Sequence, residues 1–455
     1  MVTDRLHQWR RWAGIDRPIF FIICGRAWSL VSGPVAIYLI TRFFSPEVQG
    51  YYYTFGGVMA MQVFFELGFS QCTIQFASHE FSVLRFGPDG ALEGDATARA
   101  RLASLARLSI KWYAYLSLLF VLAVGASGHL FFYLKNPGGD WIIPWWLLCG
   151  ATGLTFALAP FWALLEGCNQ VAFVYAFRTF SAILQSVVLW LSLASGAGLY
   201  ACGLPVLGLA LVSALVLYGR WRTFFRQLFK TKGHQAISWQ KEIWPFQWRT
   251  GVTWASGYFV YNFLTPLLFY FHGPAVAGQM GMSLQLVNAL HAVAVSWTYS
   301  KMPLFGILIA QRRYAELDQI FKRATTRAVG VCFLGAIVLT AGVWWLQSYY
   351  LAVGGRFLKL DALVLLLVPT ISNQFLFALS FYVRAHKIEP FMRLAIVNGV
   401  ATGLSALILA KQYGAFGGCL AYAGVQFSLL PWALSIWRNC KREWHSEGSP
   451  PKRTS

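Results

Sequence analysis

The sequence predicts an all-α polytopic membrane protein with about twelve transmembrane helices in two six-helix bundles. Of its 455 residues, 57% are hydrophobic and only 12% are charged, whereas a typical soluble domain has about 25% charged residues. The apolar segments are long and lack the alternation of a β-strand, so in lipid they must satisfy their backbone as helices. A soluble core could not bury this much apolar surface.

Roughly 20 apolar residues suffice to cross a bilayer. The predicted spans are residues 18–42, 52–78, 108–134, 141–166, 169–194, 198–218, 250–271, 275–300, 327–350, 358–383, 391–411 and 415–437. The first span is too long for a cleavable signal peptide. The chain therefore divides into an N-terminal segment 1–17, a lobe 18–218, a basic linker 219–249, a second lobe 250–437 and a tail 438–455.

The connections between spans alternate in charge. The connections on one side are rich in Lys and Arg, and they comprise 1–17, 79–107, 219–249, 301–326, 384–390 and the tail. The basic residues of the connections on the opposite side are only Arg42, Lys135, Arg356, Lys359 and Lys411. Lys and Arg collect in cytoplasmic loops, so both termini are predicted to be cytoplasmic. The net charge of +20 is then explained by loops that face anionic lipid, not by nucleic-acid binding.

Two segments on the basic side are expected to lie outside the spans. Residues 304–324 read as an amphipathic helix along the inner interface of the membrane. The tail beyond Trp444 is polar and rich in Ser and Pro, and it is predicted to be disordered.

A repeated turn indicates an internal duplication. Ser45-Pro46-Glu47-Val48-Gln49-Gly50 and Gly273-Pro274-Ala275-Val276-Ala277-Gly278 share the pattern Ser/Gly-Pro-x-Val-x-Gly at a separation of 228 residues. We interpret Pro46, Gly50, Pro274 and Gly278 as structural turn residues of two parallel six-helix halves, a transporter arrangement with the site between the lobes. The alternative is that Pro and Gly simply recur in short loops.

Ionisable residues inside spans are candidates for function, because each costs about 2.5–3.5 kcal/mol if unpaired at the bilayer centre. Arg26 in the first span and Glu66 in the second lie at similar predicted depths. Arg26 is a candidate for binding an anionic headgroup and Glu66 for coupling to a cation. A structural ion pair between them is the alternative for both.

Four further polar positions complete the predicted site. Arg178 and Arg393 occupy matching places in the fifth and eleventh spans, where they either face a central cavity or snorkel to the inner surface. His291 in the eighth span is a candidate proton-coupling group or a hydrogen-bonded packing residue, and Lys301 ends that helix. Five amides within spans are expected to form interhelical hydrogen bonds, namely Asn262, Asn288, Asn373, Gln374 and Asn398.

The cysteine pattern predicts neither a metal site nor a disulfide. The eight cysteines are scattered, without a Cys-x-x-Cys pair or a Cys/His pair at metal-ligand spacing. Most lie in apolar runs, where Cys behaves as a small hydrophobic residue. No cofactor is expected.

Three short motifs lie within the first 80 residues. They are Gly25-Arg26, then Arg42 with the turn Ser45-Pro46-Glu47-Val48-Gln49-Gly50-Tyr51, and finally Glu66-Leu67-Gly68-Phe69. Through these motifs the first 80 residues resemble the polysaccharide flippases (Wzx-like) of the multidrug/oligosaccharidyl-lipid/polysaccharide (MOP) exporter superfamily. The remainder of the chain agrees only through its twelve spans, two halves and inside N-terminus.

The resemblance implies a function. The cargo would be an undecaprenyl-pyrophosphate-linked oligosaccharide, flipped across the bacterial inner membrane by alternating access with proton or sodium coupling. Arg26 matches the family's cationic cavity position, with Arg178, Arg393 and Lys301 as additions. The resemblance also implies a polysaccharide polymerase and a chain-length regulator as candidate protein partners.

Two other functions are weighed against the flippase. A membrane glycosyltransferase or O-antigen ligase would need acidic or His residues on a substantial outer loop, and the outer connections here are short. A multidrug exporter of the same superfamily would favour an acidic cavity, whereas the predicted cavity is basic.

Overall fold

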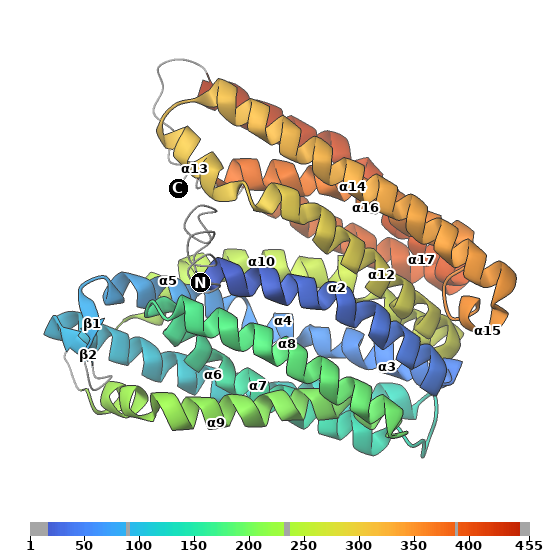
Figure 1. The fold of residues 1–455 in the computed structure, drawn as a ribbon, viewed down its shortest axis with the longest axis horizontal. Helices are drawn as coiled ribbons and strands as arrows, with labels where there is room; N and C mark the ends of the chain where they lie inside the picture. Colours follow the sequence, from blue (N-terminus) through green and yellow to red (C-terminus); the bar gives the residue numbers. More distant parts are fainter. Residues whose placement is uncertain (1–16, 88–91, 232–236, 387–389, 446–455) are drawn as a thin grey trace, which may run out of the picture. The chain divides into compact units, whose positions relative to one another are not determined.

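The computed structural model describes residues 17–87, 92–231, 237–386 and 390–445 and is almost entirely helical. Within these residues, nine helices are long and apolar enough to cross a membrane. The prediction of an all-α polytopic membrane protein is thereby confirmed (Figure 1). The predicted N-terminal segment up to residue 16 and the tail beyond residue 445 lie outside the described residues.

Three local features reconcile the nine long helices with the twelve predicted spans. The second span is divided into α3 (Pro46–Met59), η1 (Ala60–Gln62), α4 (Val63–Glu66) and α5 (Phe69–Phe81). The seventh is divided into α10 (Trp244–Tyr261) and α11 (Leu264–His272). The eleventh and twelfth are joined in α17 (Met392–His445), which turns at Gly414 through a left-handed conformation.

The chain folds as two compact units, which we call unit 1 (1–44 and 58–251) and unit 2 (45–57 and 252–455). Unit 1 contains the long helices α2 (Arg17–Phe43), α6 (Ala96–Tyr133), α7 (Ile142–Gly167), α8 (Val171–Ala194) and α9 (Tyr200–Lys230). In Figure 1 these helices run side by side: α7 packs between α6 and α9, and α8 packs between α2 and α9.

Unit 2 contains α12 (Pro274–Tyr299), α13 (Met302–Ala310), α14 (Tyr314–Tyr349), α15 (Leu351–Gly354), α16 (Leu360–Arg384) and α17. Helix α16 packs against α12, α14 and α17, and α11 packs against α12 and α17. The predicted first lobe extended unbroken over 18–218, whereas Ser45–Gly57 group with unit 2. The reason is the close packing of Gly50 against Pro274 and Gly278.

The prediction of one interfacial helix over residues 304–324 is wrong. The structure divides it between α13 and the first turns of α14, which continue into the ninth span. The division occurs at Gln311–Arg313, where Arg312 adopts a left-handed conformation with φ 56°. A second feature that the sequence did not predict is the short antiparallel hairpin β1 (Leu84–Phe86) and β2 (Leu92–Gly94).

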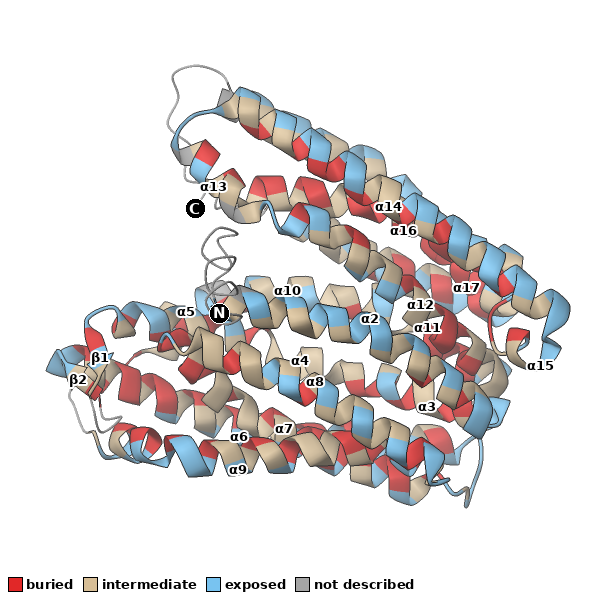
Figure 2. Ribbon diagram, viewed as in Figure 1, coloured by how far each residue is buried: buried red, intermediate tan, exposed pale blue. Residues whose placement is uncertain are grey.

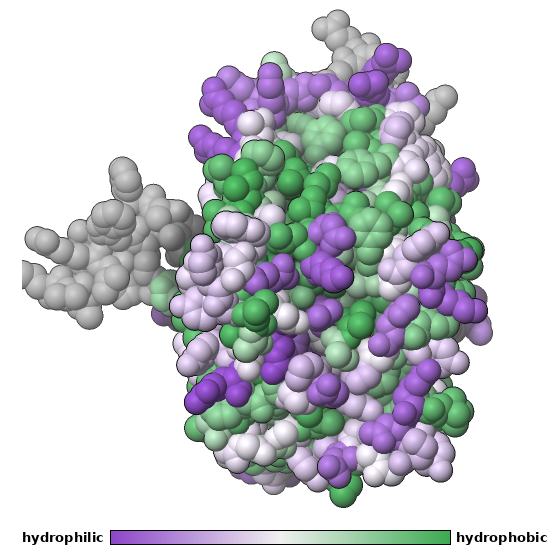
Figure 3. All heavy atoms as spheres, turned by 90° about the vertical axis from the view of Figure 1, so that its right-hand side faces the viewer, coloured by the Kyte–Doolittle hydropathy of each residue, from purple (hydrophilic) through white to green (hydrophobic). Residues whose placement is uncertain are grey.

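Exposed residues recur along the long helices (Figure 2), and many of the exposed side chains are large and apolar, as expected of lipid-facing surfaces. On α14, Phe333, Leu334, Ile337 and Val338 are all more than half exposed. At the end of the helices seen in Figure 3, by contrast, hydrophilic and hydrophobic residues intermingle. All eight cysteines are free thiols, and Cys72, Cys149, Cys168, Cys332 and Cys419 are buried.

Candidate functional site

The two repeated turns meet inside unit 2. A Cβ atom added at Gly50 would lie 1.9 Å from the carbonyl oxygen of Pro274, and one at Gly278 would lie 3.0 Å from the backbone nitrogen of Gly50. Only glycine permits so close an approach of two helix backbones. The duplicated motif therefore has a steric reason: each copy supplies one side of the crossing between α3 and α12.

Hydrogen bonds of Gln49 stabilise this crossing. Its side chain is almost completely buried, with 1% exposure, and its Nε2 donates to the carbonyl oxygens of Gly278 (2.9 Å) and Arg356 (3.2 Å). The guanidinium of Arg356 donates to Gln49 Oε1 at 3.4 Å. One amide thus connects α3 to α12 and to the segment after α15.

In unit 1, Glu66 lies at the end of α4 and accepts a hydrogen bond from the hydroxyl of Tyr113 at 3.2 Å. That hydroxyl also lies 2.6 Å from Ser70 Oγ. The hydrogen-bond partner that the structure gives Glu66 is therefore a neutral phenol on α6. This hydrogen bond holds the Glu66 carboxylate against α6.

The chain turns directly after Glu66. Leu67 and Gly68 both have positive φ, 47° and 71°. The turn fits against the start of α10, since a Cβ at Gly68 would meet Thr250 Cγ2 at 2.7 Å and one at Gly251 would meet Leu67 Cβ at 2.8 Å. Interrupted spans are common where transporters bind ions or substrate, and this one places Glu66 at the break.

Arg178 has a carboxylate partner that sequence reasoning missed. Its Nη2 lies 2.6 Å from Glu166 Oε2, where Glu166 ends α7 and Arg178 is two turns into α8. The guanidinium also lies 4.8 Å from the centre of the Tyr175 ring. The signal was available, because a three-residue connection between two helices brings such positions face to face.

Arg26 is exposed on α2, which packs on α8. Gly25 allows this packing, because a Cβ there would already lie 3.2 Å from Thr179 Oγ1. Thr179 donates to the carbonyl oxygen of Phe21 at 2.8 Å, and Trp28 Nε1 donates to Ser186 Oγ at 3.2 Å. Small residues and polar contacts of this kind associate helices in lipid, and they fix the helix that carries Arg26.

In unit 2, His291 belongs to a polar cluster between α12, α16 and α17. Its Nδ1 lies 2.7 Å from Gln374 Nε2. The amide nitrogen donates this hydrogen bond and the ring nitrogen accepts it. One helical position away, Asn373 Nδ2 donates to the hydroxyl of Tyr422 at 2.8 Å. His291, Asn373 and Tyr422 line a small cavity of about 40 Å³, which is large enough for a water molecule.

Three of the predicted interhelical amides are confirmed. Gln374 contacts His291 and Asn373 contacts Tyr422. Asn398 accepts from Gln426 Nε2 at 2.9 Å across the two arms of α17. By contrast, the predicted cations Lys301 and Arg393 lie exposed, Lys301 between α12 and α13 and Arg393 near the start of α17.

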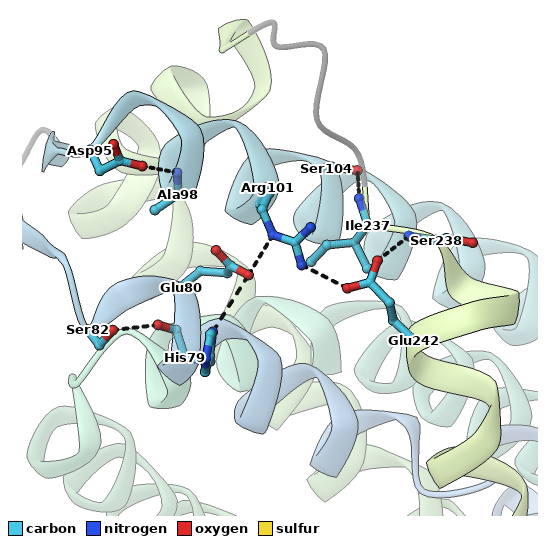
Figure 4. Close-up of polar contacts among 10 residues, drawn as sticks. All are labelled: His79, Glu80, Ser82, Asp95, Ala98, Arg101, Ser104, Ile237, Ser238 and Glu242. Atoms are coloured by element: carbon cyan, nitrogen blue, oxygen red, sulfur yellow. Dashed lines mark hydrogen bonds and ion pairs between the residues drawn. The ribbon is translucent and has the colours of Figure 1, made fainter.

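A charged network on the basic side of unit 1 was not predicted (Figure 4). Arg101 on α6 pairs through Nε with Glu80 and through Nη2 with Glu242, both at 2.8 Å. Glu242 also accepts from the backbone nitrogen of Ser238 at 2.9 Å. The backbone hydrogen bond and then Arg101 hold the pKa of Glu242 below its usual value. The network docks the segment before α10 onto α5 and α6.

No protein-family model and no curated protein matches the sequence. Among solved structures, an inward-facing MATE-family multidrug-resistance transporter of the MOP superfamily aligns with a TM-score of 0.67 at 14% identity, covering 92% of this chain and 96% of the other. The lipid II flippase MurJ in an inward closed conformation aligns at 0.66 and 14% identity, over 94% and 90%.

A third structure is a MOP superfamily transporter from Pyrococcus furiosus, described as having a binding pocket of reversed polarity. It aligns with a TM-score of 0.53 at 12% identity over 94% of both chains. The identities are low, so these likenesses concern the fold. Over nearly its whole length, the chain therefore has a fold similar to those of this MATE-family transporter and of MurJ.

Proposed function

We propose that the chain flips an undecaprenyl-pyrophosphate-linked oligosaccharide across the bacterial inner membrane for surface polysaccharide synthesis. The observation that carries the proposal is the placing of arginines within predicted spans, with Arg26 exposed on α2 and Arg393 exposed on α17. A pyrophosphate must lose water to cross, and a guanidinium offers it a planar fork of donors. The fold likeness to a lipid II flippase supports a lipid-linked cargo.

In this proposal Arg178 binds the cargo only under one condition. Its guanidinium is held by Glu166, so it binds the cargo only when phosphate oxygens replace that carboxylate. Arg26 therefore carries the larger share of the predicted headgroup binding, with Arg393 and Lys301 as secondary cations. Glu66 and His291 are the proposed coupling residues, each held by one neutral partner.

The proposal is tested in cells that lack the native copy of the gene. Arg26→Ala is expected to abolish surface polysaccharide and to accumulate lipid-linked oligosaccharide, whereas Arg26→Lys retains part of the activity. Arg85→Ala is the matched control, because Arg85 lies on the hairpin and its side chain is 81% exposed. Membrane levels of each variant are compared by immunoblot. Full complementation by Arg26→Ala would show that the assigned role is wrong.

A multidrug exporter is the second candidate. The observation that favours it is the fold likeness to MATE-family transporters, together with a carboxylate at the break of the second span, as a cationic drug would require. Efflux of a cationic dye from the same cells separates the two functions. The flippase proposal expects dye efflux to be the same with and without the gene.

The remaining partners follow from the proposed cargo. A polysaccharide polymerase and a chain-length regulator would receive the flipped unit, and anionic lipids would contact the basic loops. Co-purification of the tagged chain from membranes with either protein is the direct test. We also propose the orientation with both termini in the cytoplasm, which rests on the alternating loop charge.

A further inference from the structure

Unit 2 has a groove that none of the proposed transport residues lines. It lies between α14, α16 and the last part of α17 and has a volume of about 630 Å³, within the range of about 300–1,000 Å³ common for small-molecule sites. The α14 wall is one stripe at helical spacing, which includes Phe321, Thr325, Val329 and Phe333. Phe375 and Trp437 form the other side.

The groove is apolar along most of its length and charged at one end. Lys322 and Lys441 line that end together with Asp318. The carboxylate of Asp318 is occupied, because Lys441 Nζ lies 2.6 Å from one oxygen and Tyr382 donates to the other at 3.0 Å. Lys441 also lies 5.2 Å from the centre of the Trp437 ring. The charged end therefore presents a net positive charge.

Two buried polar atoms lie one turn below the lysines. Thr325 Oγ1 and Trp437 Nε1 have no hydrogen-bond partner in the described part of the chain. Buried donors normally find an acceptor. A ligand with oxygen atoms just beneath its charged group would supply one after a rotation of the Thr325 side chain.

The length of the groove matches one leaflet of a bilayer. From Lys322 to Phe333 the helix rises about 16 Å at 1.5 Å per residue. Half of the hydrocarbon core measures about 15 Å. A ligand that fits this groove has an anionic headgroup, polar atoms at the depth of Thr325, and a hydrocarbon chain that extends from there into the leaflet.

We propose that this groove binds an anionic glycerophospholipid of the leaflet on the basic side. The phosphate contacts Lys322 and Lys441, the ester oxygens face Thr325 and Trp437, and one acyl chain lies along Phe321, Val329 and Phe333. The bound lipid is a structural ligand of unit 2, and the proposal does not depend on which cargo the chain carries.

Two glycines of α14 give a matched pair of variants. Gly330 lines the groove, and a Cβ added there meets no atom within 4 Å. Gly342 lies on the same helix outside the groove, with equally open space. Gly330→Phe is expected to fill the groove without disturbing the backbone, whereas Gly342→Phe adds the same side chain elsewhere.

The experiment is native mass spectrometry of the purified full chain, exposed to phosphatidylglycerol or to zwitterionic phosphatidylethanolamine. We expect the unaltered chain to retain phosphatidylglycerol at least 5-fold better, a ratio equivalent to about 1 kcal/mol. Lys322→Gln should remove most of this preference and Gly330→Phe most of the retention, with Gly342→Phe unchanged.

Several results would overturn the proposal. Equal retention by Gly330→Phe and Gly342→Phe would show that the lipid binds elsewhere. Equal retention of the two phospholipids would exclude headgroup recognition by the lysines. Displacement of phosphatidylglycerol by undecaprenyl pyrophosphate at equal concentration would assign the groove to the cargo instead. None of these results bears on the polysaccharide test of Arg26→Ala, so the two proposals fail separately.

Discussion

The basic side of unit 1 and the interior of unit 2 connect their helices by different chemistry. On the basic side of unit 1, Arg101 joins three segments through two carboxylates. In the interior of unit 2 the connecting side chains are the neutral amides Gln49, Gln374 and Asn373. They contact carbonyl, imidazole and hydroxyl groups, and Gln49 also accepts from the guanidinium of Arg356. Ions are costly at membrane depth, so charge pairs are placed near helix ends and neutral hydrogen bonds inside.

The largest expected effect is steric and lies in unit 2. Gly50→Ala puts a methyl group 1.9 Å from the Pro274 carbonyl oxygen, so two helices must separate and break the contacts of Gln49. We expect a loss of about 3 kcal/mol, the upper end for overpacking, seen as a lower melting temperature in detergent. Gly56→Ala on the same helix meets no atom within 4 Å and should not be destabilised.

The next effect tests the charged region of unit 1. Arg101→Ala leaves the carboxylate of Glu80, only 7% exposed, without its guanidinium. We expect a loss of about 2 kcal/mol, below the 3–5 kcal/mol of a fully buried pair because Arg101 is partly exposed. Arg85→Ala removes an exposed pair with Glu93 and should cost about 0.5 kcal/mol or less. Equal melting temperatures for the two variants would contradict this assignment.

A smaller effect is expected in the polar interior of unit 2. Gln374→Leu removes the hydrogen bond to His291 Nδ1 and should lower the free energy of unfolding by about 1 kcal/mol. Ser428→Ala is the control, because its exposed hydroxyl donates to Gly424 within its own helix. If Gln374→Leu is as stable as the unaltered chain, the His291 contact contributes nothing to unit 2.

The smallest effect is the pH dependence of Glu242. Its pKa is lowered by the backbone hydrogen bond from Ser238 and by Arg101. A lowered folded-state pKa gives stability that is present above the unfolded value of about 4.3 and is lost as pH falls towards the folded value. We therefore expect the melting temperature to fall modestly below about pH 4.5. Glu242→Gln should flatten that part of the curve, and an unchanged curve would exclude the contribution.

The sequence predicted the spans well, because a long apolar segment is a strong signal for a transmembrane helix. It did not predict the interruptions within spans, because no residue pattern marks them strongly. Leu67 and Arg312 adopt left-handed conformations that neither residue type favours, so tertiary contacts impose them. Gly68 and Gly414 are the residue type expected at such turns, but glycine is frequent along this chain. The division of the second span and of the 304–324 segment could not be read from composition.

The structure gives three of the predicted residues side-chain partners that the sequence did not predict. Sequence reasoning identified Arg178, Glu66 and His291 as costly intramembrane groups, but it did not identify Glu166 or Tyr113 as the side chains that hold them. Pairing between helices depends on helix rotation, which hydropathy does not fix. The repeated turn was recognised in the sequence only as a sign of two similar halves, and the close crossing that Gly50 and Gly278 make was not predicted.

The shielding of the cysteines has a practical consequence. With five of the eight thiols buried and the other three partly buried, the natural chain should react slowly with a water-soluble maleimide that cannot cross membranes. A single new thiol at Asp140, in the connection before α7, or at Arg85, on the hairpin, would then be labelled over a low background. Intact cells should label only the first if the alternating loop charge orients the chain correctly.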